Sequence, residues 1–246
     1  MTEPPLIEAR ELVKHFHGLQ AIDRVSFAVQ RGEMLGLIGP NGAGKTTLIN
    51  LISGTLPADG GSLSFEGAAI DPLPPYARAQ LGIGRTFQVT KPFPRLTVLE
   101  NVAVGALFGF GGGEHDLTRA REQARVLLEF TGLAHRAEQQ GNQLSGPDRK
   151  RLELARVLAM RPKLLLLDEV MAGLNPSEVD EVVAIVKRIR DRGTTIIVIE
   201  HVMRAIRSLS DRIIVLHHGE MLAEGEPNEI LADARVIDAY LGKRRE

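Results

Sequence analysis

The chain has 246 residues, 43% of them hydrophobic and 25% charged, with a formal net charge of −1. This composition suits one large core or a core with a subdomain, and it gives no global attraction for nucleic acid or an anionic membrane. The absence of cysteine excludes disulfides and thiol chemistry. Residues 1–5 lack the features of a signal peptide, and no apolar run reaches the ~18 residues of a membrane span. We therefore expect a soluble, cytoplasmic chain that reaches a membrane only through a partner.

The first residues predict two strands of an antiparallel sheet, at 6–10 and 24–29. Between them we predict a polar loop, the polar stretch 14–18, that contains Phe16. Aromatic residues are scarce in this chain, with eight Phe, two Tyr and no Trp. Phe16 is therefore a candidate for stacking on a nucleotide base, and a core phenylalanine at a strand end is the alternative.

The rest of the chain is organised around residues 39–46. They read Gly-Pro-Asn-Gly-Ala-Gly-Lys-Thr and fit the phosphate-binding pattern of Gly, four residues and Gly-Lys-Ser/Thr. A predicted buried strand at 34–38 enters the loop, and a predicted helix at 46–52 leaves it. Gly42 and Gly44 allow the backbone to curl and to point its N–H groups at phosphate oxygens near the positive end of the helix.

Two side chains of this loop carry chemistry. Lys45 supplies a positive charge for the β- and γ-phosphates, and the Thr46 hydroxyl is a natural Mg²⁺ ligand. An ordinary glycine-rich turn is the alternative. The predicted nucleotide-binding residues are Phe16, Gly39, Pro40, Asn41, Gly42, Ala43, Gly44, Lys45, Thr46 and Thr47.

Strand signals continue after the loop. Residues 60–65 read as a strand and the proline-rich residues 71–75 as a surface connection. A further strand is predicted at 81–88 and ends in the polar residue Gln88. A rigid loop with Phe93 follows it.

From about residue 92 the pattern becomes helical. Thr97 and Glu100 form a capping box that begins one helix. After a glycine-rich joint at 109–113, apolar residues at helical spacing predict another helix over 117–131.

We therefore predict an α/β fold with a single domain over residues 1–246. Residues 1–91 and 146–246 form a phosphate-loop core with an antiparallel β subdomain, and residues 92–145 form an inserted helical subdomain.

Polar groups follow two predicted strands of the core. The apolar strand at 164–168 ends in Asp168 and Glu169, and His201 comes shortly after a strand at 194–199. Ligands of parallel sheets bind beyond the carboxyl ends of the strands. Asp168 is therefore placed to meet the Mg²⁺ of the phosphate loop, Glu169 to polarise a water, and His201 to reach a γ-phosphate. An acidic pair that caps a helix and an ordinary surface histidine are the alternatives.

Ser145 is a predicted N-cap, followed by Gly146 and by Pro147, which a first helical turn tolerates. Such a helix N-terminus could bind an anion, and a simple capped helix is the alternative. Asn175 begins an amphipathic helix. The chain then continues with a predicted hairpin, at 212–216 and 220–223, and two short helices, at 227–231 and 235–241.

In this order the motifs resemble those of the ATP-binding-cassette ATPases over nearly the whole chain. The resemblance implies ATP hydrolysis, with Mg²⁺ held by Thr46, Gln88 and Asp168, the last either directly or through water. The matching positions are 39–46 for Walker A, 164–168 for Walker B, Gln88 for the Q-loop, Ser145, Gly146, Pro147 and Asp148 for the signature, Glu169 for the catalytic glutamate, 172–175 for the D-loop, His201 for the switch histidine and Phe16 for the aromatic that stacks on adenine.

Within that family the chain is most similar to the ATPase subunits of branched-chain amino-acid importers, and importers of urea, amides and aromatic acids share much of the pattern. The stretches on which this similarity rests are 83–88, 152–156, 172–176 and 240–242. The resemblance implies two transmembrane permease subunits, an extracytoplasmic solute-binding protein and a second ATPase, either related or identical. It implies no nucleic acid, and a location on the inner face of the cell membrane.

The chain departs from the family pattern in the signature, where Pro147 and Asp148 replace Gly and Gln. Proline has no N–H, so one donor to the γ-phosphate of a partner is missing. Asn175 replaces an Asp of the D-loop, and Val170 a Pro. Because signature residues of one ATPase complete the nucleotide site of the other, we expect two unequal sites.

Three other protein classes compete with the importer. The ATPase of a lipopolysaccharide exporter usually carries a different sequence before Gln88. Soluble cassette proteins of translation or DNA repair usually have two cassettes or a long coiled coil. A nucleotide kinase or GTPase would leave Gln88, Ser145 and His201 unexplained.

Overall fold

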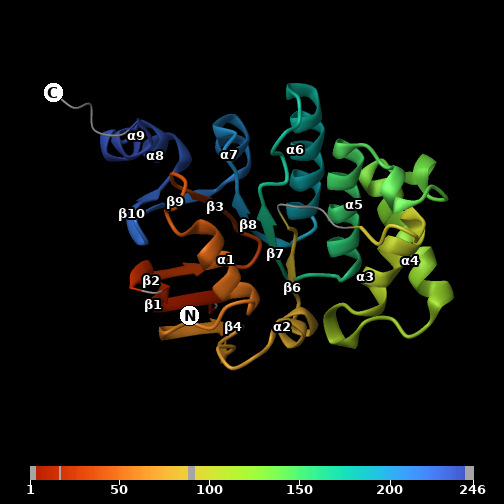
Figure 1. The fold of residues 1–246 in the computed structure, drawn as a ribbon, viewed down its shortest axis with the longest axis horizontal. Coiled ribbons are helices and arrows are strands. Elements are labelled where there is room, and N and C mark those ends of the chain that lie inside the picture. Colours follow the sequence, from red (N-terminus) through yellow and green to blue (C-terminus); the bar gives the residue numbers. More distant parts are fainter. Residues whose placement is uncertain (1–3, 17, 88–91, 242–246) are drawn as a thin grey trace. The chain divides into compact units, whose positions relative to one another are not determined.

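The computed structural model describes residues 4–16, 18–87 and 92–241 (Figure 1). The chain forms two compact units, residues 1–75 with 195–246 (unit 1) and residues 76–194 (unit 2). The helical insert predicted at 92–145 belongs to unit 2, and its separation from the core stays a prediction. Within the described ranges, every helix falls short of the length and apolar character that crossing a bilayer needs.

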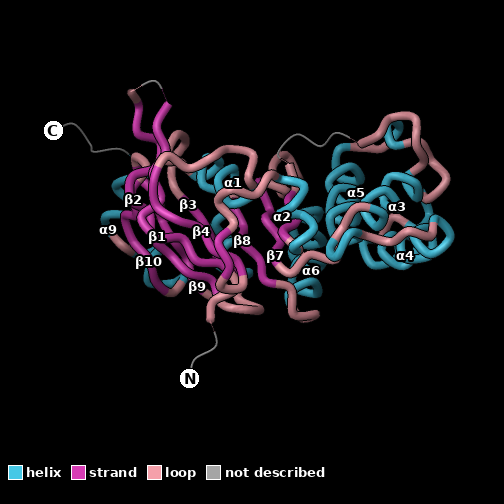
Figure 2. The backbone as a smooth tube through the Cα atoms, turned by 90° about the horizontal axis from the view of Figure 1, so that it is seen from below, coloured by secondary structure: helices cyan, strands magenta, loops and turns pink. Residues whose placement is uncertain are grey.

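Unit 1 contains an antiparallel sheet in the order β2-β1-β4-β5 (Figure 2). Its strands are β1 (Ile7–Phe16), β2 (Leu19–Val29), β4 (Gly60–Phe65) and β5 (Ala68–Ala69). The predicted end of the first strand is wrong, because β1 continues to Phe16, which pairs with Leu19. The polar stretch predicted as a loop therefore belongs largely to a hairpin.

A second set of strands in unit 1 lies in the order β10-β9-β3-β8, with β3 parallel to both β8 and β9. All residues of β3 and β8 are buried, which explains their continuous apolar sequences. The strands are β3 (Met34–Ile38), β8 (Thr195–Ile199), β9 (Arg212–His217) and β10 (Glu220–Gly225). The helices of this unit are α1 (Lys45–Ser53), α7 (Met203–Leu209), α8 (Pro227–Ala232) and α9 (Ala234–Leu241).

The described residues of unit 2 contain two parallel strands and four long helices. The strands are β6 (Ile83–Arg85) and β7 (Leu164–Asp168), and the long helices are α3 (Val98–Leu107), α4 (Leu117–Thr131), α5 (Gly146–Ala159) and α6 (Pro176–Arg190). A shorter helix, α2 (Pro75–Leu81), was not predicted from the sequence. It includes Leu81, the first residue of the strand expected at 81–88, and β6 begins only at Ile83.

The helices α3, α4 and α5 share one apolar core in unit 2. Val102, Leu128 and Leu152 are fully buried within it, and each such side chain contributes ~1.5–3 kcal/mol when it leaves water. The bounds of α4 agree with the prediction because local signals set both ends: Asp116 caps the N-terminus and Gly132 ends the helix in a left-handed conformation.

Candidate functional site

The phosphate loop predicted at 39–46 connects β3 to α1 in unit 1. Gly44 is the N-cap of α1 with φ 106°, and a Cβ there would lie 2.6 Å from Ala21 O. A Cβ on Gly39 would lie 2.2 Å from Leu216 O. Both distances are far below van der Waals contact, so these two positions accept only glycine. A need for glycine was predicted from the sequence at position 44 but not at position 39.

Lys45 is 7% exposed, and its ammonium is held at the start of the loop. Its Nζ donates to Gly39 O at 2.6 Å and to Pro40 O at 3.0 Å. Thr46 follows in the first turn of α1 and is exposed. The N–H groups of this turn point out of the helix end, so the loop combines amide donors, one ammonium and one accessible hydroxyl.

The same loop is tied to the C-terminal part of unit 1. Gly39 N donates to Tyr240 Oη at 2.7 Å, and Gly219 N donates to Ala43 O at 3.1 Å. Burial raises the pKa of the Tyr240 phenol, and the hydrogen bond from Gly39 opposes that rise. Neither tie was predicted from the sequence.

His201 lies at the same sheet edge as the phosphate loop. In the parallel pairing of β3 and β8, Leu37 stands opposite Ile199. Gly39 and His201 each lie two residues beyond this pair, so both follow the carboxyl ends of neighbouring strands. The imidazole is exposed. This agrees with the placement predicted for His201.

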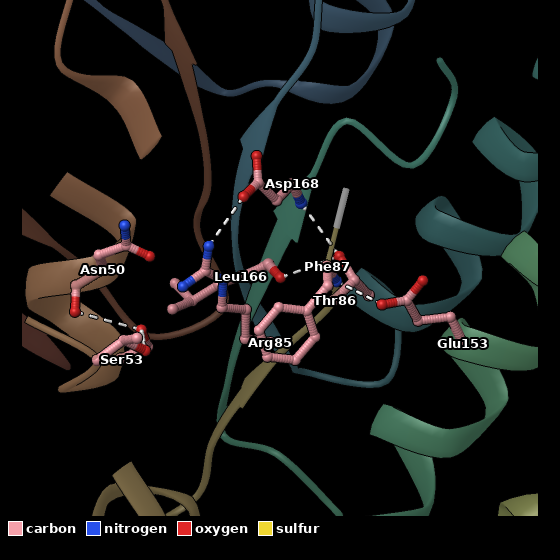
Figure 3. A network of polar contacts seen from close by, with 9 residues as sticks. Asn50, Ser53, Arg85, Thr86, Phe87, Glu153, Leu166 and Asp168 are labelled. Atoms are coloured by element: carbon pink, nitrogen blue, oxygen red, sulfur yellow. Dashed lines mark hydrogen bonds and ion pairs between the residues drawn. The ribbon is translucent and has the colours of Figure 1, made fainter. Parts of the chain in front are cut away.

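In unit 2, Asp168 ends β7 and is 2% exposed (Figure 3). Arg85 Nη2 donates to its Oδ2 at 3.0 Å. The Asp168 N–H donates to Thr86 Oγ1 at 3.1 Å, while the Thr86 N–H donates to Leu166 O at 2.9 Å. Arg85, the last residue of β6, and Thr86, which follows it, thus fix the carboxylate and the backbone of Asp168. From the sequence, Arg85 belonged only to a stretch that carries the family resemblance, and no role was predicted for it.

Glu169 directly follows β7 and has a left-handed backbone, with φ 51°. Such a conformation is unfavourable for a residue with a Cβ and is concentrated at functional sites. Its carbonyl oxygen accepts from Lys150 Nζ at 3.3 Å, a contact that holds the backbone. The side chain is half-buried. The carboxylate is therefore presented by a constrained backbone.

Two further predicted site residues are Gln88 and Phe16. Gln88 lies outside the described residues. Just before it, the Phe87 N–H donates to Glu153 Oε1. Phe16, the predicted adenine-stacking residue, is 38% exposed at the end of β1, with Lys14 Nζ 5.7 Å from its ring centroid. A partly exposed ring remains available for stacking.

The predicted signature stretch opens α5 in unit 2. Ser145 is its N-cap, and Ser145 Oγ accepts from the Asp148 N–H at 3.3 Å. Pro147 lies in the first turn, as predicted. Asn175 likewise caps α6 in a capping box with Glu178. The amide of Asp148 is thus engaged within the chain, and residue 147 has none.

Comparison with known proteins shows the class of this chain. The profile of the ABC transporter family matches residues 22–172. A second profile, of the branched-chain amino acid ATP-binding cassette transporter, matches residues 220–246. The chain belongs to the ABC transporter family, and it is an ATP-hydrolysing subunit of that class.

Individual relatives extend the match over almost the full length. The high-affinity branched-chain amino acid transport ATP-binding protein LivG of Salmonella typhimurium is 37% identical over 97% of this chain and 98% of that protein. A solved ATP-binding cassette in its ADP conformation has a TM-score of 0.87 and 33% identity, covering 97% of this chain and 99% of that one. A dimeric cassette bound to ADP and Pi has a TM-score of 0.81 and 26% identity over 90% of this chain and 98% of that one.

Proposed function

We propose that the chain powers an importer of branched-chain amino acids or of a related small solute such as urea, an amide or an aromatic acid. The observation that carries the ATPase role is the phosphate loop, with Gly39 and Gly44 in positions that admit no side chain and Lys45 held at the loop entrance. The solute class is supported by the names of the relatives and by the match at 220–246.

In the proposed reaction the loop amides and Lys45 bind the phosphates of ATP, and Phe16 stacks on the adenine. Thr46, Asp168 and Gln88 would hold Mg²⁺. The Thr46 hydroxyl is exposed and the Asp168 carboxylate is oriented by Arg85, and such oxygen donors suit this ion. When bound, Mg²⁺ would neutralise charge on the phosphates.

Glu169 orients the attacking water and accepts its proton, while His201 contacts the γ-phosphate. Positioning and electrostatic stabilisation supply most of the rate acceleration in phosphoryl transfer. The constrained backbone of Glu169 supports this role.

We place the permease contact at a groove of about 200 Å³ in unit 2. Phe87 and Phe108 line it and are 55% and 68% exposed. Nearby, the guanidinium of Arg156, which also lines the groove, lies 4.9 Å from the centroid of the Phe93 ring. Exposed aromatic rings with a cationic rim suit a short helix of a membrane partner. The chain would then lie peripherally on the inner face of the membrane.

We further propose that this chain pairs with a second ATPase and that the two nucleotide sites are unequal. The support is the first turn of α5, where Pro147 has no N–H and the Asp148 N–H is already bonded to Ser145. Asp148 also adds a negative charge where a phosphate of the partner's ATP would approach, which is unfavourable. This chain's own Walker residues carry no such departure.

Purification of the tagged chain from gently solubilised host membranes tests the transporter role. Two permeases, a second cassette ATPase and an extracytoplasmic binding protein should copurify. That binding protein can then be screened with amino acids, urea and aromatic acids. Recovery with lipopolysaccharide-export proteins would replace import by export, and recovery without any membrane protein would contradict the transporter role.

Replacement of the proposed catalytic carboxylate tests the chemistry. Glu169→Gln should retain ATP binding and reduce turnover by at least ~10²-fold, because the amide cannot accept the proton of water. Nucleotide affinity and phosphate release are measured on the same preparation. Near-normal hydrolysis by this variant would contradict the role given to Glu169.

A further inference from the structure

One contact of the phosphate loop has no part in the proposed hydrolysis. The Gly39 N–H donates to Tyr240 Oη at 2.7 Å, although 201 positions separate the two residues along the chain. Tyr240 lies in α9, within the C-terminal stretch that matches a family profile of its own. The C-terminal helix therefore reaches the first residue of the phosphate loop.

The surroundings of Gly39 explain why its N–H needs this acceptor. Gly39 is buried, and its Cα faces Leu216 O so closely that no side chain fits there. A buried N–H without an acceptor loses its hydration and gains nothing in return. The Tyr240 hydroxyl supplies this acceptor.

The same residue also holds the lysine of the loop. Gly39 O accepts from Lys45 Nζ at 2.6 Å, and Pro40 O accepts from the same atom at 3.0 Å. The N–H of Gly39 thus faces the C-terminal helix, and its carbonyl faces the ammonium that would bind phosphate. A rotation of the Gly39 backbone would displace both acceptors of Lys45.

The helix that carries the hydroxyl is itself anchored. Val236 of α9 is 3% exposed, and Ile230 of the preceding α8 is 5% exposed. At the junction, the Val236 N–H donates to Asp233 O at 3.0 Å. Because Val236 is buried and α9 packs against α8 and β10, Tyr240 presents its hydroxyl from a defined position.

We propose that Tyr240 is a positioning residue for the phosphate loop. Its hydroxyl fixes Gly39, and through Gly39 it holds Lys45 where a nucleoside triphosphate binds. The C-terminal segment thereby sets the affinity for ATP without touching it. This inference rests on the proposed binding of ATP by the loop.

The test compares Tyr240→Phe with Tyr76→Phe in the full chain. Tyr76 is the other tyrosine, is 71% exposed in α2 and has no place in the loop. Loss of the hydroxyl reduces the fraction of chains whose loop can bind ATP. The apparent affinity for ATP falls in proportion to that fraction. We expect Tyr240→Phe to raise the KM for ATP and the Kd for a fluorescent ATP analogue about tenfold. The kcat should change less than about twofold, and Tyr76→Phe should match the wild type.

A spectroscopic measurement covers the case in which Tyr240→Phe folds poorly. The chain contains no tryptophan and two tyrosines, so in the Tyr76→Phe variant tyrosine emission comes from Tyr240 alone. Binding of ATP at the loop should change this emission, whereas addition of magnesium alone should not.

The outcomes separate the two proposals. A wild-type chain that binds no ATP would contradict the proposed function and the inference with it. Equal ATP affinity and KM in wild type and Tyr240→Phe would overturn the inference alone. A lowered kcat with unchanged KM would also overturn it, because a positioning role in binding predicts the opposite split.

Discussion

Asn101 offers the sharpest test of how unit 2 is built. It lies in α3 and is fully buried. Its Oδ1 accepts from the Phe93 N–H at 2.8 Å, and its Nδ2 lies within 3.2 Å of the carbonyl oxygens of Phe93, Leu96 and Thr97. One side chain therefore folds the loop that precedes the helix. Asn101→Leu preserves the shape of the side chain and removes all of these bonds.

The stability lost in Asn101→Leu follows from the number of hydrogen bonds that the Asn101 side chain forms at the same time. An amide nitrogen has two hydrogens, so the three carbonyls share two donors, and the Phe93 N–H adds a third bond. At ~1 kcal/mol net for each bond, the loss is about 3 kcal/mol. For a chain of this size each kcal/mol lowers the Tm by ~2–4 °C, so the expected decrease is about 6–12 °C.

Differential scanning calorimetry of the purified chain measures this change. Asn142→Leu is the matched control, since Asn142 is exposed and its side chain has no contact among those described. A decrease below about 2 °C for Asn101→Leu, or one equal to that of the control, would refute the argument that Asn101 organises the Phe93 loop.

Two further changes test separate parts of the chain. Pro147→Gly restores an N–H at the start of α5 and should raise ATP turnover of the assembled transporter; unchanged turnover would contradict the proposed asymmetry. In unit 1, hydrogen bonds from Lys14 Nζ (2.8 Å) and from the His15 N–H (2.7 Å) lower the pKa of Asp59. A lowered pKa in the folded state means that the stabilisation is present above the unfolded pKa of ~3.9 and is lost as pH falls through the folded value. Urea unfolding of wild type and Asp59→Asn should therefore differ near neutral pH and converge in acid, and a difference independent of pH would contradict this reasoning.

Much of the chain could be predicted from sequence because its signals are local. The phosphate loop depends on glycine spacing between a strand and a helix. The ends of α4 depend on Asp116 and Gly132, which satisfy the backbone groups of the helix termini. The capping box of Thr97 and Glu100 and the start of a helix at Asn175 were likewise predicted and found. Each of these caps joins residues within four positions of one another, and the phosphate loop lies within residues 39–46.

The errors of prediction occur where the partner is distant or the pattern is mixed. The polar residues after Arg10 suggested a loop, but β1 continues to Phe16 because pairing with β2 provides partners for its backbone. The helix α2 is short and lies where a proline-rich connection was expected to lead directly into a strand. Its seven residues give too weak a periodicity to be read from sequence.

The sequence by itself determined which chemical groups the protein has and the motif to which each belongs: the glycines and Lys45 of the loop, the carboxylates after β7 and the caps of the helices. Only the tertiary structure decided how those groups are held. Arg85 meets Asp168 across 83 positions and Tyr240 meets Gly39 across 201. Local periodicity contains no information about such pairs, because hydrogen bonds depend on positions that only the packed strands and helices define.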